Sequence, residues 1–218
     1  MKQNNKKKNT ESILSGSRRL FLFFLILIIL TVAVAVFTSQ QQETTLPPSQ
    51  TYSWKFQGRD WTINIPVQSS LNAEYSNRSR ERPFDSFVYD SFDGGYIKTV
   101  ARALEQQAQQ SGMSTKDIPY FVVTFVQSLP FTEDNVTSGF DEYPRFPTET
   151  LLAGGGDCED SSILGAALLQ ELGFDVSLLE FSDHMALGVA CTENLTSVNY
   201  LSDGRRYCYF ETTGNGWN

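Results

Sequence analysis

The sequence predicts an α+β domain that follows a single N-terminal apolar segment. Residues 20–37 form an uninterrupted apolar run. Three later stretches place apolar side chains at helical spacing, and the chain after residue 174 is rich in short runs of β-branched and aromatic residues. The 168 residues from 51 to 218 suffice for one domain with a core of its own.

The N-terminal part combines a basic tail with the apolar run. Residues 1–19 carry a net charge of +5, and the 18 residues of the run would span about 27 Å as a helix, close to the hydrocarbon thickness of a bilayer. We therefore expect a cytoplasmic tail over 1–19 and a transmembrane anchor over 20–38, with the following chain outside the cytoplasm. The alternatives are a cleaved signal peptide, whose apolar region is normally shorter, and a buried helix, which normally has a polar face.

The chain after the anchor is acidic. Residues 39–50 are polar, contain proline and lack periodicity, which predicts a linker before a domain over 51–218. After residue 38 there are 11 Lys and Arg against 24 Asp and Glu, a net charge of −13. This balance argues against nucleic acid or an anionic membrane surface as a binding partner.

The first half of the domain predicts a hairpin and two helices. Runs of aromatic and β-branched residues over 54–67 flank Gln57-Gly58, which is typical of a β-hairpin. Apolar residues at helical spacing predict helices over 96–110 and from Ser114 to about residue 128. Two polar stretches without periodicity, 71–95 and 130–147, are expected to be irregular.

The second half predicts one helix followed by strands. The helix runs from about Cys158 to Leu172, with acidic residues in its first turn and Gly173 as its stop signal. Strands are predicted over 174–180, 185–191, 199–201 and 207–212, with a tight turn at Asp203-Gly204.

Cys158 lies in the first turn of that helix, and His184 is the only histidine of the chain. Unpaired N–H groups at a helix start stabilise a thiolate, and a nearby imidazole accepts the thiol proton, so the two residues predict a thiol nucleophile. Asp157, Glu159 and Asp160 oppose this, because negative charge around a thiol raises its pKa, so the histidine must supply much of the activation. The alternatives are a buried apolar cysteine and a strand-end histidine with a local hydrogen bond.

A histidine base needs an acid that fixes its tautomer, and Glu211 at the end of the last predicted strand is the candidate. Antiparallel pairing with the strand after His184 would put the two opposite each other. In that register Cys191 faces Gly204, about 13 Å along the strand from Cys208, which exceeds the Cα separation of about 7 Å that a disulfide allows. We therefore predict no bridge between these two cysteines.

A zinc site made from the three cysteines and His184 is a further alternative. The chain has no Cys-x-x-Cys pair, so we expect neither a metal nor another cofactor.

Four segments in this order resemble a known family: residues 143–151 (YPRFPTETL), 155–164 (GGDCEDSSIL), 183–189 (DHMALGV) and 209–213 (YFETT). They resemble the prokaryotic transglutaminase-like proteins, which belong with the papain-like thiol enzymes. The resemblance covers the chain from about residue 54 onward. It implies a papain/transglutaminase-like core, in which the helix that carries the nucleophile packs on an antiparallel β-sheet.

By this resemblance Cys158 is the nucleophile, His184 the base and Glu211 the third member, where the family usually has Asp. The resemblance also leads us to expect a further segment after Asn218. Gln127 on the second predicted helix is a candidate oxyanion donor, the alternative being a solvent-facing glutamine.

The sequence thus predicts a membrane-anchored, extracytoplasmic thiol enzyme. It would transfer the acyl group of an amide in a protein or peptide substrate to water, as a peptidase or amidase, or to an amine, as a transglutaminase does. The alternative is a non-catalytic module on the same fold that binds a peptide or a polymer of the cell envelope.

Overall fold

The computed structural model describes residues 24–32, 49–67, 74–80, 83–92, 94–133, 143–191 and 198–214. The chain divides into two compact units, Met1–Leu46 and Pro47–Asn218. In the first unit residues 24–32 form a helix with exposed side chains, and the rest of the predicted anchor lies outside the described residues. Within the ranges given above, no helix is both long and apolar enough to cross a membrane.

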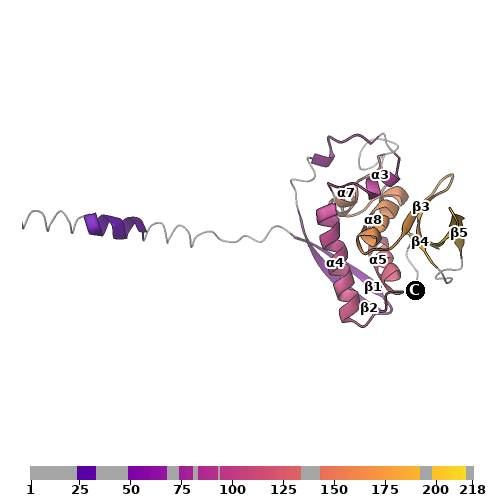
Figure 1. Ribbon diagram of the computed structural model, residues 1–218, viewed down its shortest axis with the longest axis horizontal. Helices are drawn as coiled ribbons and strands as arrows, with labels where there is room; N and C mark the ends of the chain where they lie inside the picture. The colour runs from indigo at the N-terminus through magenta and orange to yellow at the C-terminus, as the bar shows by residue number, and fades with distance from the viewer. Residues whose placement is uncertain are drawn as a thin grey trace, which may run out of the picture. The chain divides into compact units, whose positions relative to one another are not determined.

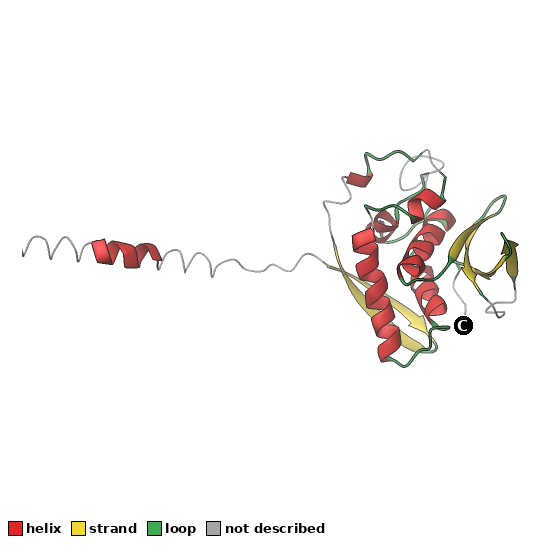
Figure 2. Cartoon of the chain, in the orientation of Figure 1, coloured by secondary structure: helices red, strands yellow, loops and turns green. Residues whose placement is uncertain are grey.

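The second unit is an α+β domain with antiparallel sheets, as predicted (Figure 1; Figure 2). It begins with the predicted hairpin of β1 (Ser49–Phe56) and β2 (Arg59–Pro66). The turn residues Gln57 and Gly58 have φ of 49° and 71°, the backbone geometry of two-residue turns that match the twist of the strands. Alternate side chains of β1 are buried and contact α5 (Ile118–Gln127): Tyr52, Trp54 and Phe56.

The central helix is α8 (Cys158–Glu171), which contacts α4 (Gly94–Gln110), α5, β3 (Val176–Glu180) and β4 (Met185–Ala190). Every residue of α8 from Asp160 to Leu169 is buried. A helix that is buried on all sides has no polar face, so its apolar residues are not confined to one stripe. Its sequence accordingly combines leucine with small and hydroxyl residues around the whole helix.

The four-stranded sheet has the strand order β3-β4-β6-β5, and all its neighbours are antiparallel. Its last two strands are β5 (Asn199–Ser202) and β6 (Arg205–Phe210), joined at Asp203-Gly204 by a turn with φ of 49° and 75°. The sheet therefore places the last strand of the sequence beside β4, inside the sheet, and leaves β3 at one edge.

The register between β4 and β6 differs by two residues from the predicted one. Ala190 pairs with Tyr207, so Cys191 lies diagonally across from Cys208 with a Cα separation of 5.9 Å. The two cysteines form a disulfide. The prediction that they are not bridged was wrong, because it rested on the incorrect register.

Two short helices were not predicted: α3 (Asp85–Val88) lies inside a stretch expected to be irregular, and α7 (Pro147–Ala153) begins at the last residue of the other such stretch. The Glu149 side chain accepts the N–H of the residue before α7 at 2.9 Å, and Gly154 ends the helix with φ of 76°. Proline at the first position, glutamate at the third and glycine after the last are start and stop signals that the loop prediction overlooked.

Candidate active site

The start of α8 is fixed by a cap and by the glycines before it. The Asp157 carboxylate accepts a hydrogen bond from the Asp160 N–H at 3.2 Å, which caps the helix. The Gly156 carbonyl accepts the N–H of Thr132 at 3.0 Å. A Cβ atom at Gly156 would lie 2.3 Å from the Asp160 carboxylate, so glycine is required for this close approach. These contacts determine where the helix begins and so where the first side chain of α8 lies.

That first side chain is Cys158, the one free cysteine of the chain. Its thiol donates a hydrogen bond to the Glu159 carboxylate at 3.0 Å and also hydrogen-bonds to the backbone of Met185. Burial, the hydrogen bond to Glu159 and the negative charges of Glu159 and Asp157 raise the pKa of the thiol to about 12, although the Met185 backbone acts in the opposite direction. In this arrangement the thiol is protonated at neutral pH.

His184 directly precedes Met185, so the thiol lies against the backbone beside the predicted base. Its Nε2 lies 3.0 Å from the Glu211 carboxylate. An ionised carboxylate can only accept, so Nε2 carries the proton and Nδ1 is left as the proton acceptor. In the described arrangement His184 Nδ1 and the Cys158 thiol are not hydrogen-bonded to each other, because the thiol points to Glu159.

Both oxygens of the Glu211 carboxylate are occupied. Oε2 accepts hydrogen bonds from His184 and, at 2.7 Å, from the Tyr209 hydroxyl. Oε1 accepts the N–H groups of Thr212 and Thr213 at 2.9 and 3.0 Å and the Thr213 hydroxyl at 2.8 Å. Burial raises the pKa of Glu211, but these hydrogen bonds outweigh it and hold the pKa at about 2. The carboxylate is therefore ionised and oriented towards the imidazole.

Ser162 ties α8 to the two segments that carry the base and the acid. It lies one helical turn after Cys158 and is fully buried. Its hydroxyl is 3.1 Å from the Met185 carbonyl and 2.9 Å from the Thr212 hydroxyl. These two partners are direct neighbours of His184 and Glu211, so one buried hydroxyl group holds all three predicted site residues in a common frame.

A second buried link fixes the back of the same helix turn. Arg145 donates its N–H to the Asp160 carboxylate at 2.6 Å, and its guanidinium forms an ion pair with the same group. The Asp160 side chain is fully buried and that of Arg145 nearly so. Breaking one partner of such a pair leaves an uncompensated buried charge, so the pair holds the loop before α7 against α8.

Gln127 is buried at the end of α5, which contradicts the alternative of a solvent-facing glutamine. Its side-chain amide donates to the backbone carbonyl of Glu211 at 2.8 Å. It therefore contributes to the site by supporting the acid, and the predicted oxyanion role would have to use its second N–H.

The disulfide removes Cys191 and Cys208 from the zinc set considered above. Elsewhere in the described ranges, no three or more His, Cys, Asp and Glu side chains come together in a way that could hold a metal ion.

Sequence reasoning missed Tyr209, Ser162 and the two threonines. A signal for Tyr209 was present, because residues two apart on a strand share a face and Tyr209 is two residues before Glu211. Ser162 likewise lies four residues after Cys158, on the same side of α8. Phe181 was also missed; its ring stacks beside the His184 ring at a centroid distance of 6.5 Å.

In comparisons with known proteins, the sequence matches no protein-family model and no curated protein.

Proposed function

We propose that the chain is a thiol enzyme that transfers acyl groups from amides, with Cys158 as nucleophile, His184 as base and Glu211 as the acid that orients the imidazole. The observation that carries the proposal is the 3.0 Å contact between His184 Nε2 and the Glu211 carboxylate. This contact leaves Nδ1 as the acceptor, on a residue whose neighbour already hydrogen-bonds to the thiol.

The reaction follows from these positions. The thiol proton passes to Nδ1, and Sγ attacks the amide carbonyl carbon. The backbone N–H of Cys158 at the start of α8 donates to the oxyanion. The C–N bond then breaks, the amine leaves with the proton from Nδ1, and a thioester remains on Cys158. Water or a second amine attacks the thioester through the same base and restores the thiol.

For the first step the thiol must leave Glu159. In the contact described above Glu159 keeps the proton on sulfur, whereas rotation of the Cys158 side chain towards Nδ1 would exchange an anionic neighbour for a basic one. Binding of a substrate that draws Glu159 away would favour this rotation. The proposed enzyme is therefore at rest in the described arrangement.

The second candidate is a non-catalytic module that binds a peptide or envelope polymer. The observation that favours it is the 3.0 Å hydrogen bond from the Cys158 thiol to the Glu159 carboxylate, which keeps the proton on sulfur and, with burial, raises the pKa of the thiol. The five hydrogen bonds that the Glu211 carboxylate accepts favour the enzyme, because a binding surface has no need of an imidazole held in one tautomer.

The test is the pH dependence of iodoacetamide alkylation without reductant, which reports on Cys158 alone because the other cysteines are bridged. In the Glu159→Gln background, in which the thiol has lost its anionic partner and can turn towards Nδ1, we expect Cys158 to be alkylated at pH 6–7 and the added His184→Ala to remove this reactivity. Asp183→Ala in the same background, a change at the exposed neighbouring residue, is the control and should leave the rate unchanged. An inert thiol, or one indifferent to His184, would favour the binding module.

We further propose that the domain has a papain/transglutaminase-like core and lies outside the cytoplasm on an N-terminal membrane anchor. The packing of α8 on the sheet that ends at His184 and Glu211 supports the first point. The disulfide supports the second, because such bonds persist in oxidising compartments. Protease protection in intact and permeabilised cells tests it: digestion of the domain only after permeabilisation of the cytoplasmic membrane would contradict an outward orientation.

A further inference from the structure

We propose that the groove between α3 and β3 binds an extended peptide with a basic side chain, which adds as a strand to the free edge of β3 and leads to Cys158. This inference deepens the proposed function by naming its substrate class, and it rests on that function for the direction of the peptide towards the thiol.

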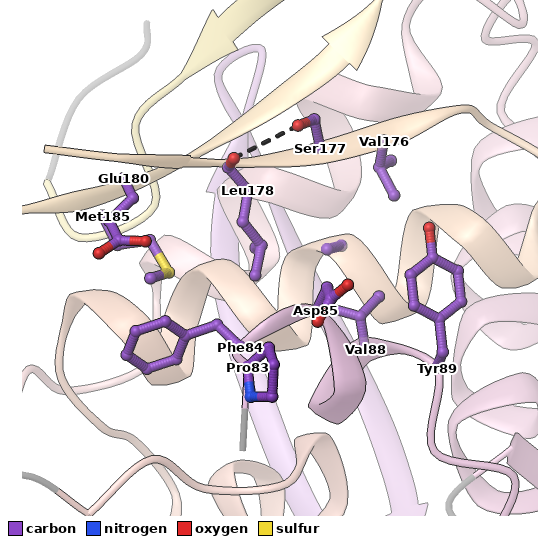
Figure 3. Close-up of a pocket in the computed structure, with 11 residues that line it drawn as sticks. Pro83, Phe84, Asp85, Val88, Tyr89, Val176, Ser177, Leu178, Glu180 and Met185 are labelled. Carbon is purple, nitrogen blue, oxygen red and sulfur yellow. Dashed lines mark hydrogen bonds between the residues drawn. The ribbon is translucent and has the colours of Figure 1, made fainter. Parts of the chain in front are cut away.

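The groove has a volume of about 420 Å³. Figure 3 shows Phe84 and Val88 on one side and Leu178 and Met185 on the other. Ala166 of α8 also lines it. These side chains form an apolar lining, and a volume of about 420 Å³ has room for a short extended segment rather than a folded partner.

One wall of the groove is a sheet edge with unused backbone groups. The N–H of Phe181 donates to the His184 carbonyl and that of Ala190 to the Asp175 carbonyl, both at 2.8 Å. Backbone hydrogen bonds alternate along an antiparallel pair of strands. The odd-numbered residues of β3 therefore direct their backbone N–H and C=O groups towards β4, and the even-numbered residues direct theirs to the open edge of the sheet. Three residues of β3 thus direct their N–H groups to the open edge: Val176, Leu178 and Glu180.

These three N–H groups have no backbone partner in the part of the chain that the structure describes. The Leu178 carbonyl accepts the hydroxyl of Ser177 at 3.3 Å, the dashed contact in Figure 3. An open edge of this kind is a template for an added strand, and the main-chain hydrogen bonds supply affinity whatever the side chains are.

One end of the groove lies beside a residue that contacts the proposed nucleophile. Glu180 pairs with Met185, whose backbone hydrogen-bonds to the Cys158 thiol. At the other end Ala166 lies eight residues along α8 from Cys158, about 12 Å away. A strand advances about 3.3 Å per residue, so about four residues of an added strand would connect the far end of the groove to the nucleophile.

The charge of the lining residues selects the side chain of the occupant. Asp85 and Glu180 are the charged residues that line the groove, both are exposed, and no lysine or arginine lines it in the described part of the chain. A lysine or arginine of the peptide can lay its apolar stem along Phe84 and Met185 and place its charged end at either carboxylate. The net charge of −13 after residue 38 adds long-range attraction for such a peptide.

The first experiment measures peptide binding to the full chain with Cys158→Ala, so that no turnover occurs. The probes are an acetylated hexapeptide of alternating leucine and arginine and its counterpart with glutamate for arginine. We expect the arginine peptide to bind about ten-fold tighter at low salt, with the difference shrinking as salt is added. Equal affinities for the two peptides would overturn the charge argument.

Two substitutions in the same Cys158→Ala background locate the charge. Glu180→Gln should weaken binding of the arginine peptide about two- to five-fold. Asp203→Asn is the matched control: it removes the same charge from an exposed residue at the turn beside β5, the opposite edge of the sheet, and should leave binding unchanged. Equal effects of the two substitutions would mean that only the net charge matters.

Strand addition has a signature of its own. Alternate amides of the bound peptide point towards β3 or away from it. N-methylation of the amides that point towards β3 should weaken binding about ten-fold, because two main-chain hydrogen bonds are lost, whereas N-methylation of the other amides should be tolerated. Amide hydrogen exchange at Leu178 and Glu180 should slow on binding, whereas Leu179, which already faces β4, should change little. Indifference to N-methylation of either set of amides, with no protection at Leu178 and Glu180, would overturn the proposal.

The outcomes separate this inference from the proposed function. Peptide binding with protection of β3, but no amide turnover by the wild type, leaves the groove in place and refutes the enzyme. Turnover of amides by the wild type without any preference for the arginine peptide, and without an effect of Glu180→Gln, supports the enzyme and refutes the groove.

Discussion

Glu159 accepts the side-chain hydrogen bond of the Cys158 thiol, so the substitution Glu159→Gln tests the electrostatic reasoning most directly. The carboxylate accepts the thiol hydrogen bond at 3.0 Å and adds a negative charge next to sulfur. Glutamine keeps the length and shape of the side chain and removes the charge. We therefore expect the pKa of Cys158 to fall from its raised value.

The magnitude follows from the separation of the two groups. Two unit charges about 4 Å apart interact with about 4 kcal/mol at an effective dielectric constant near 20, which corresponds to about three pKa units. Glu159 is half-buried, so solvent screening reduces this to about one to two units. Thiolate nucleophilicity falls as the pKa falls, so the alkylation rate below the pKa should rise about three- to fifteen-fold rather than ten- to hundred-fold.

The assay is iodoacetamide alkylation of Cys158 between pH 6 and 10, without reductant, followed by mass spectrometry of the intact chain. Glu171→Gln is the matched control, because it removes the same charge at the far end of the same helix, about 20 Å from the thiol. An unchanged rate profile for Glu159→Gln, or an equal shift in both variants, would refute the contribution of Glu159, beside that of burial, to the raised pKa of the thiol.

Three further predictions concern stability. The low pKa of Glu211, about 2 against an ordinary 4.5, stabilises the fold fully above pH 4.5, and this contribution is lost as the pH falls through 2; with screening of the partly exposed group it amounts to about 1–2 kcal/mol. Urea unfolding between pH 2 and 6 should show this pH dependence in the wild type and lack it in Glu211→Gln. Replacing both bridged cysteines by alanine opens a loop with a sequence separation of 17 and should lower the free energy of unfolding by about 3 kcal/mol, whereas a loss below about 1 kcal/mol would contradict the expected effect. Ser162→Ala should cost about 1–3 kcal/mol because buried partners lose a hydrogen bond, and the neighbouring Ser161→Ala, measured by the same thermal unfolding, should cost less than half as much.

The elements that sequence predicted well are those fixed by local pattern. The hairpin turn at Gln57-Gly58 needs positive φ at both residues, and the observed angles agree. The start of α8 at Cys158 and its end before Gly173 also follow from local signals, the acidic first turn and the glycine stop. The pairing of His184 with Glu211 was predicted from the end points of two strands, and the two side chains do meet.

The register could not be predicted from the same patterns, for a physical reason. Side chains alternate along a strand with a period of two, so a slip of one residue exposes the buried face whereas a slip of two keeps every side chain on its own face. The observed register differs from the expected one by such a double step, and the alternation of β6 is compatible with both. The backbone pairing of Ala190 with Tyr207 and the Cys191–Cys208 disulfide distinguish them in the structure.

The hydrogen-bond partner of the Cys158 thiol could not be predicted from the sequence either. The acids around Cys158 were expected to raise its pKa, but which of them it would contact depends on a side-chain rotamer. The structure selects Glu159, while the Asp157 carboxylate accepts the Asp160 N–H as a helix cap. Sequence order alone does not distinguish these two neighbours.

The position of β6 has a consequence for the order in which the protein matures. Among the described strands β6 is synthesised last, yet it lies between β4 and β5. A ribosome that has released β4 has therefore produced His184 without the carboxylate that orients it, and Cys191 without its partner thiol. Docking of β6 supplies Glu211 and Cys208 in one step. Until β6 docks, the imidazole lacks its carboxylate partner and Cys191 is an unpaired thiol, so formation of the Cys191–Cys208 bond reports that β6 has reached its place in the sheet.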